Sequence, residues 1–289
     1  MIVHAYSDIF VKYLFGSAGH EDLLLRFIND VLGHSGSTRI ASVDILNPFN
    51  LQTFPKDKLT ILDVKGKDNK GKIYNIEIQS SGDETYKHRA LYYWAKLYSS
   101  QIKEGEHYTK LHPVISINLL HFHLIKEHND YYSCFRLTKN DDHDLVLTNH
   151  LSIYFIELLN FTKKIPKNLN SLEKWLYFFK YEGKEDEFMK VIIKDDEILE
   201  KADRLYKRFT QDEQLKDIYE SIVEGERKYL TDLELAERKG IEQGIEKGIE
   251  KGIEKGRHEI AQLMLKQGLE IDLISKTTQL TVEEIEQLK

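Results

Sequence analysis

The chain has 289 residues, 41% of them hydrophobic, which is enough for one large domain or two small ones with a sizeable core. Its 48 acidic and 41 basic residues give a formal net charge of −7, which argues against a partner held by overall positive charge. The single cysteine, Cys134, excludes an internal disulfide, and the lack of a long apolar run or a signal-peptide pattern predicts a cytoplasmic protein without a membrane span.

The first segment predicts helices followed by a strand. Residues 7–32 have the pattern of a helix or a helix pair, with Ser7 or Asp8 as N-cap and Gly33 as the stop. Residues 38–46 predict a first strand. The segment that follows, from Asn47 to Pro55, predicts a loop that can border a functional site.

Two apolar runs then predict a β-hairpin. The runs are Leu59–Val64 and Ile73–Ile78, and the segment between them, Lys65–Lys72, is rich in turn-forming residues. Residues two apart in a strand share a face. The second strand therefore has an apolar face and a polar face, the polar one formed by Asn75, Glu77 and Gln79.

The hairpin predicts a metal site. Asp63 interrupts a run that otherwise looks buried, and a buried carboxylate is costly unless it is paired or metal-bound. Strand pairing would bring Asp63 close to Glu77, and two converging carboxylates suit Mg²⁺. The alternative is an exposed hairpin whose charges lie on its solvated face.

A helix from Asp83 or Glu84 to about Lys103 follows the hairpin, with apolar residues at helical spacing. Arg89 and Tyr93 lie four residues apart and share another face, so they could hold a phosphate near the carboxylates. The alternative places Arg89 in an ordinary salt bridge and Tyr93 in the core.

Three later strands are predicted at residues 112–120, 131–137 and 151–157, which with the preceding elements gives an α/β fold with a mixed sheet flanked by helices. Histidines at the end of the first of these strands suggest a Zn²⁺ site as an alternative, although no cysteine or carboxylate cluster completes it. These histidines are His121, His123 and His128.

The remainder of the chain is helical in pattern. Helices are predicted over residues 169–181, 185–209 and 211–236, where they would pack on the sheet or extend it. The predicted organisation has four parts. These are a core at 1–165, a helical extension at 166–236, a repeat at 237–258 and a small helical tail at 259–289.

The segment Gly240–Gly256 repeats every four residues. Isoleucines form a stripe that drifts by about 40° at each step around a helix, flanked by Glu and Lys. Its glycines weaken a helix but permit close helix approach. A flexible linker and an oligomerisation helix that would make the protein a homo-oligomer are both consistent with this pattern.

The tail holds two short helical patterns separated by Gly268, and Thr281–Glu284 resembles a capping box. The arrangement is reminiscent of a helix-turn-helix. Its second helix is acidic, which suits phosphate contact poorly and favours a packing or partner-specificity module.

The residues Leu59–Gln79, followed by Arg89–Tyr93, resemble the PD-(D/E)xK nuclease superfamily and, within it, the recombination-promoting nuclease (Rpn) and transposase-like family. Asp8–Gly16 resembles the opening helix of that family, and Pro113–Asn118 resembles its next core strand. The likeness covers most of residues 1–235.

The resemblance implies a restriction-endonuclease-like core and a Mg²⁺-dependent DNA endonuclease, with Mn²⁺ as a substitute ion. Asp63 and Glu77 would be the metal-binding acids, together with the Ile78 carbonyl, and Gln79 would orient the attacking water. Supporting roles would fall to nearby polar residues, namely Asp8, Lys12, Lys65, Arg89 and Tyr93.

The chain departs from the superfamily pattern at two positions. Leu62 replaces a proline that is only loosely kept in the superfamily. Gln79 replaces the usual lysine, so the bound metal must contribute more to activation of the water. Lys65 or Lys12 could supply the missing charge. Two rival functions remain open: a catalytically weak DNA-binding or recombination accessory protein, and an oligomeric scaffold driven by the repeat.

Overall fold

The computed structural model describes residues 3–49, 63–163, 168–184 and 187–288. The chain forms two compact units, Met1–Ile222 and Val223–Lys289, and the boundary between them falls inside one helix, α7 (Glu213–Lys266). The site residues predicted from the sequence all belong to the first unit, so its sheet is the frame on which the site is built.

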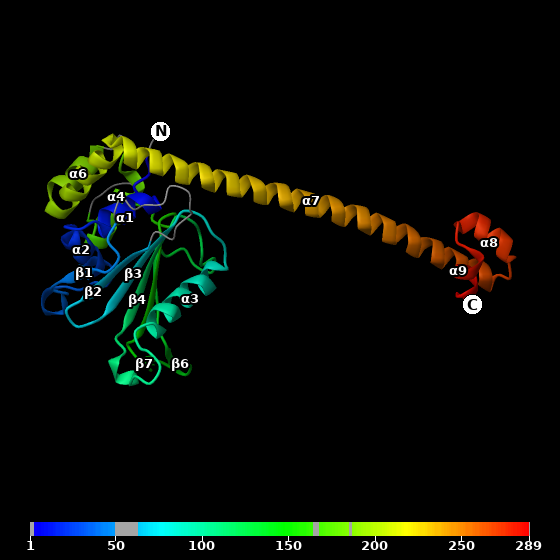
Figure 1. Ribbon diagram of the computed structural model, residues 1–289, viewed down its shortest axis with the longest axis horizontal. Coiled ribbons are helices and arrows are strands. Elements are labelled where there is room, and N and C mark those ends of the chain that lie inside the picture. The colour runs from blue at the N-terminus through cyan, green and yellow to red at the C-terminus, as the bar shows by residue number, and fades with distance from the viewer. Residues whose placement is uncertain (1–2, 50–62, 164–167, 185–186, 289) are drawn as a thin grey trace. The chain divides into compact units, whose positions relative to one another are not determined.

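A mixed six-stranded sheet in the order β1-β2-β3-β4-β8-β5 forms the centre of the first unit (Figure 1). Its strands are β1 (Val43–Ile45), β2 (Val64–Asp68), β3 (Ile73–Gln79), β4 (Val114–Leu120), β5 (Tyr132–Phe135) and β8 (Leu151–Glu157). The central strands β3, β4 and β8 are parallel, whereas both edges are antiparallel. The predicted α/β class with a mixed sheet is confirmed.

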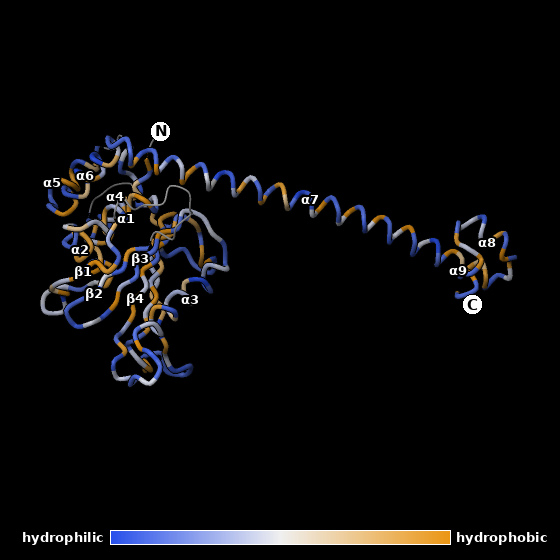
Figure 2. The backbone as a smooth tube through the Cα atoms, viewed as in Figure 1, coloured by the Kyte–Doolittle hydropathy of each residue, from blue (hydrophilic) through white to orange (hydrophobic). Residues whose placement is uncertain are grey.

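Helices cover both faces of this sheet. The helices of the first unit that precede α7 are α1 (Asp8–Gly16), α2 (Glu21–Val31), α3 (Tyr86–Ser99), α4 (Ser171–Tyr181), α5 (Glu187–Lys194) and α6 (Glu197–Gln211). Helix α3 buries Tyr86 and Ala90 against Leu120 and the odd-numbered residues of β8. On the opposite face, α2 lies very close to β2. A Cβ atom added at Gly66 would lie 3.3 Å from the side chain of Leu24 of α2. Figure 2 shows apolar residues concentrated in the central strands of the sheet.

Aromatic side chains dominate the packing between helices of the first unit. Phe15 and Phe27 stack with ring centroids 4.8 Å apart, and Trp175 of α4 meets both edge-on. All three are buried. Because Trp175 also donates its indole N–H to Asp30 of α2 (3.0 Å), the helical extension is joined to the N-terminal helices by packing and by a hydrogen bond.

The hairpin differs from its prediction in where the first strand lies. Strand β2 begins at Val64 and includes four residues that were assigned to the turn, while residues 59–62 lie outside the described part of the chain. The strand extends because it pairs with β1 as well as β3. Asp68 closes the shorter turn, since its Oδ1 accepts from the backbone N–H groups of Lys70 and Lys72, both at 2.9 Å, and Gly71 supplies a φ of +84°.

Two further elements differ from the predictions. A small sheet of β6 (Thr138–Lys139) and β7 (Asp142–Val146) occupies a stretch for which no element was predicted. The single helix predicted over 185–209 is broken before Glu197, where Asp196 caps α6 through its carboxylate. Asp196 also pairs with Arg26 of α2 at 2.9 Å, so a long-range ion pair fixes the position of the break.

The second unit combines most of α7 with two short helices, α8 (Ile271–Thr278) and α9 (Val282–Glu286). Helix α7 runs without interruption through the glycine-isoleucine repeat, so in this structure the repeat is helical. The predicted capping box is present, with Thr281 and Glu284 bonded reciprocally. A small core joins Ala261, Ile274 and Ile285. The four-part division of the chain stays a prediction.

No helix in the described residues combines the length and the apolar character needed to cross a membrane.

Candidate active site

Strand pairing brings the two predicted metal-binding acids to the same place. In the antiparallel register of β2 and β3, Val64 lies opposite Ile76 and Lys65 lies opposite Asn75. One further step along the same register places Asp63 opposite Glu77. Because side chains alternate across a sheet, both carboxylates lie on the face covered by α3.

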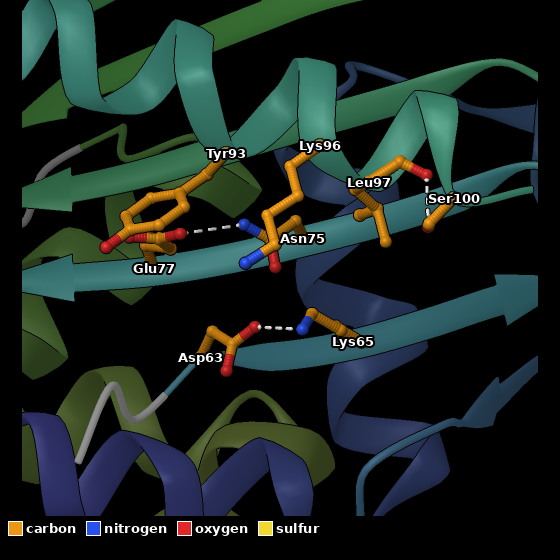
Figure 3. A pocket seen from close by; sticks show the side chains of 8 residues that line it. All are labelled: Asp63, Lys65, Asn75, Glu77, Tyr93, Lys96, Leu97 and Ser100. Carbon is orange, nitrogen blue, oxygen red and sulfur yellow. Dashed lines mark hydrogen bonds and ion pairs between the residues drawn. The ribbon is translucent and has the colours of Figure 1, made fainter.

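These residues line a pocket of about 250 Å³ between the sheet and α3. Figure 3 shows the carboxylates of Asp63 and Glu77 on neighbouring strands, with Tyr93 reaching down from α3 over Glu77. The lining residues come from β2, β3 and α3 and from the residue just before β2. They are Asp63, Lys65, Asn75, Glu77, Tyr93, Lys96, Leu97 and Ser100.

Glu77 is a buried acid in an environment that opposes its charge. Burial raises its pKa, and the nearby negative charge of Asp63 raises it further. A hydrogen bond from the Asn75 amide at 2.9 Å and the positive charges of Arg89 and Lys65 act in the opposite direction. A cation bound between the two acids would favour the ionised form of Glu77.

Asp63 is held from two sides. Its carboxylate pairs with Lys65 at 2.8 Å. Its backbone carbonyl accepts a hydrogen bond from Nδ2 of Asn47 at 3.1 Å, and Oδ1 of Asn47 accepts from the backbone N–H of Lys65 at 2.7 Å. Asn47 therefore acts as a clamp that holds the backbone on both sides of Val64, at the start of β2. The sequence suggested only that its loop borders the site, because an asparagine after a strand has no pattern that reveals its partner.

Lys12 lies behind the site and does not line the pocket. It is buried on α1, and its Nζ donates to the backbone carbonyls of Asn47 (2.9 Å) and Asp63. Burial lowers its pKa to about 8, the charge of Asp63 opposes that shift, and Lys65 adds to it. Since both of these hydrogen bonds go to backbone oxygens, Lys12 holds the backbone on either side of the site.

Gln79 and Arg89 bind each other at the end of β3. Arg89 donates to the side-chain oxygen of Gln79, and its guanidinium lies 4.6 Å from the ring centroid of Tyr86. Gln79 is absent from the pocket lining, so its amide is engaged beside the pocket and not within it. The Tyr86 hydroxyl donates to Asn118 at 3.0 Å, which connects α3 to β4 under the site.

The other predicted residues are placed as follows. Asp8 begins α1. Burial raises the pKa of Tyr86, and the negative charges of Glu77 and, to a lesser extent, Asp8 raise it further, which puts Asp8 on that side of the site. Ile78 lies in β3 between Glu77 and Gln79, with its side chain buried on the opposite face. Sequence reasoning missed Lys96, which lines the pocket from α3 one turn beyond Tyr93.

The residues present fit a hard divalent cation with few protein ligands. No group of three His, Cys, Asp or Glu side chains suited to a metal occurs among the described residues, so Asp63 and Glu77 form a pair. Asn75 adds a third oxygen, because its Oδ1 is buried without a hydrogen-bond partner in the described structure. Oxygen donors of this kind suit Mg²⁺ or Mn²⁺, which usually keep several waters.

The zinc alternative has no support from the described residues. His121 stacks on Tyr6 with ring centroids 4.0 Å apart, and burial lowers its pKa. His128 instead accepts a hydrogen bond from the backbone N–H of Asp130. These histidines therefore act in local packing and turns.

A mixed sheet that carries two converging acids in a pocket beneath a helix defines a nuclease-like class of protein. Residues 5–238 match the model of the PD-(D/E)XK nuclease family transposase, and the chain belongs to this family. Residues 255–289 match the C-terminal helix-turn-helix domain of the Rpn/YhgA-like nuclease family. No curated protein and no solved structure matches the chain. The resemblance inferred from the sequence is confirmed.

Proposed function

We propose that the protein is a divalent-metal-dependent DNA endonuclease linked to recombination or mobile elements. The observation that carries this proposal is the placement of Asp63 opposite Glu77 in one pocket, on the fold of a nuclease family. Mg²⁺, or Mn²⁺ in its place, would be held by these two carboxylates, with the Ile78 carbonyl or the Asn75 amide oxygen as a further ligand. The bound ion supplies positive charge at the scissile phosphate and lowers the pKa of bound water.

The protein's own groups then position the reactants. Asp63 and Glu77 would hold the metal ion beside the scissile phosphate. Lys65 and Lys96 place positive charge in the same pocket for the phosphate oxygens. Tyr93 covers Glu77 and limits the access of bulk water. Gln79 orients the attacking water through its amide once DNA or the metal draws it from Arg89.

DNA is the expected polymer. The family match to a C-terminal helix-turn-helix gives a second DNA-contacting module, although α9 is acidic. With a net charge of −7, binding should be weak, dependent on metal and sensitive to salt.

The contact between Arg89 and Gln79 favours a second candidate function, a DNA-binding accessory protein with weak catalysis. In that role the amide expected to orient water would stay engaged by the guanidinium.

Nicking of supercoiled plasmid by the full-length protein in Mg²⁺ separates the two. We expect nicking that disappears in Asp63→Asn and in Glu77→Gln, with DNA binding reduced to the level that the wild type shows without metal. Glu106→Gln is the matched control, because Glu106 is a surface acid paired with Lys110 far from the pocket. Nicking by Asp63→Asn at the wild-type rate would overturn the proposed site. DNA binding without nicking by the wild type would select the accessory role.

A further inference from the structure

The repeat on α7 leaves an apolar row and a glycine row that the chain itself does not use. Its four isoleucines are exposed, at 52–59% of their surface. These are Ile241, Ile245, Ile249 and Ile253. A Cβ added at any of the five repeat glycines would meet nothing within 4 Å in the described structure. Figure 2 shows apolar segments recurring along this stretch of α7. Intramolecular packing therefore explains neither row.

The four-residue period sorts the side chains into parallel rows around the helix. Each residue advances by about 100°, so the successive rows are Ile, Glu, Lys or Gln, and Gly. The Ile row and the Gly row are neighbours. The Glu row borders the outer side of the Ile row, and the mostly Lys row borders the outer side of the Gly row. Each helix thus carries a ridge, a groove and two charged edges of opposite sign.

These rows fit a second copy of the same helix. Rows of residues four apart form the ridges and grooves of the commonest helix packing, with a crossing angle near −50°. A row without side chains is a deep groove, and an Ile row is a continuous ridge. We propose that two copies of this chain associate in parallel, with the Ile row of each helix seated in the Gly row of its partner.

Charge selects the parallel direction. A two-fold axis along paired helices sets the Ile side of one copy against the Gly side of the other, so the Glu edge of each helix meets the Lys edge of its partner. In an antiparallel pair, Ile sides meet and Glu faces Glu. The proposal does not depend on the nuclease assignment.

The association should be modest. Four isoleucines per chain bury on the order of 1,000 Å² in total at full contact, which is the low end for specific interfaces. The crossing angle confines the closest contact to the central repeats. A concentration-dependent equilibrium in the micromolar range is the expected behaviour.

Sedimentation velocity of the full-length protein over a range of concentrations tests the interface. We expect a dimer that is lost in Ile245→Glu/Ile249→Glu and weakened at least tenfold in Gly248→Leu. Leucine is a better helix former than glycine, so Gly248→Leu raises helix content by circular dichroism while it fills the groove. Gly225→Leu makes the same substitution on α7 outside the repeat, where an added Cβ also meets nothing within 4 Å in the described structure, and should leave the dimer unchanged. A monomer at all concentrations, or a dimer indifferent to Gly248→Leu and to the isoleucine variant, overturns the proposal.

Spin labels test the direction. In a Cys134→Ser background, a single label at Lys266→Cys lies 18 residues beyond Gly248. A parallel crossing separates two such labels by about 25 Å, and an antiparallel one by about 50 Å, from a rise of 1.5 Å per residue and the crossing angle. The longer distance would contradict the parallel arrangement.

Discussion

The two compact units of this chain are stabilised in different ways. In Met1–Ile222 the helices and the sheet bury their apolar faces against each other, around aromatic residues such as Trp175. In Val223–Lys289 the core is small and most of α7 is exposed. The first unit can therefore be explained from contacts within the chain. The second has an exposed row of isoleucines that contacts within the described chain do not explain, and that the proposed dimer would bury.

The largest expected effect contrasts a core aromatic with an exposed isoleucine. Phe27→Ala removes a buried ring that packs on Phe15, Trp175 and Phe179, and should lower the free energy of unfolding by about 3–5 kcal/mol. Ile249→Ala should change it by less than about 0.5 kcal/mol when the protein is monomeric. Urea unfolding of dilute protein measures both, with tryptophan fluorescence reporting on the first unit, which holds Trp94 and Trp175, and far-ultraviolet circular dichroism reporting on the helical second unit. Equal losses would show that the repeat packs against its own chain.

A second contrast concerns ion pairs on α6. Asp196→Asn should cost about 2 kcal/mol, because it removes a buried charge that pairs with Arg26 and Lys174 while an asparagine can still cap the helix. Glu200→Gln on the same helix removes only an exposed pair with Arg204 and should be nearly neutral. The same urea experiment measures the loss of unfolding free energy in both variants. Equal effects would mean that the long-range pair does not hold α6 in place.

The sequence predicts the elements that local patterns determine, and it fails where contacts between distant segments decide. Strand β3, helix α3 and the strands β4 and β8 were predicted because periodicity and turn residues act locally. The end of the first hairpin strand was wrong, since pairing with β1 on its other edge extends β2 through Asp68. The unbroken α7 could not be predicted because glycine and isoleucine at a period of four are consistent with a helix or a linker.

The candidate site shows the same limit. Asp63, Glu77 and Tyr93 were recognisable because strand alternation and helix spacing point them to one place. The clamp of Asn47 and Lys12 on the Asp63 backbone was not, because it joins α1, a loop and β2 through contacts that no short motif contains. Asn75 was placed on the polar face, yet its buried free oxygen appears only when the sheet is assembled.

The clamp gives a third prediction, which depends on the proposed function. Asn47→Ala removes the bonds to the Asp63 carbonyl and the Lys65 N–H, and residues that orient metal ligands commonly contribute 10–100-fold. We expect nicking to fall about tenfold, with a higher Mg²⁺ concentration needed for half-maximal rate. Asn160→Ala, an exposed asparagine bonded to the Asp130 carbonyl, is the control and should have no effect. An unchanged Mg²⁺ dependence in Asn47→Ala would show that the clamp does not position Asp63 for metal binding.

A fourth prediction separates the units by pH. Burial, together with the negative charge of Asp203, raises the pKa of Glu182 from 4.5 to about 7. The folded state thus binds this proton more tightly than the unfolded chain does. The resulting stability is complete below about 4.5 and is lost as the pH rises through about 7. Glu182→Gln cannot ionise, so its Tm should exceed that of the wild type at pH 8 and match it near pH 4.

Every buried acid of the described structure lies in the first unit, and the exposed Glu284 of the second has its pKa lowered by bonds from Thr281. Glu284→Gln should therefore leave the Tm of the first unit unchanged at both pH values. A Glu182→Gln variant whose Tm follows the wild type across this range would show that Glu182 is ionised in the folded protein at neutral pH, with Lys207 offsetting its burial.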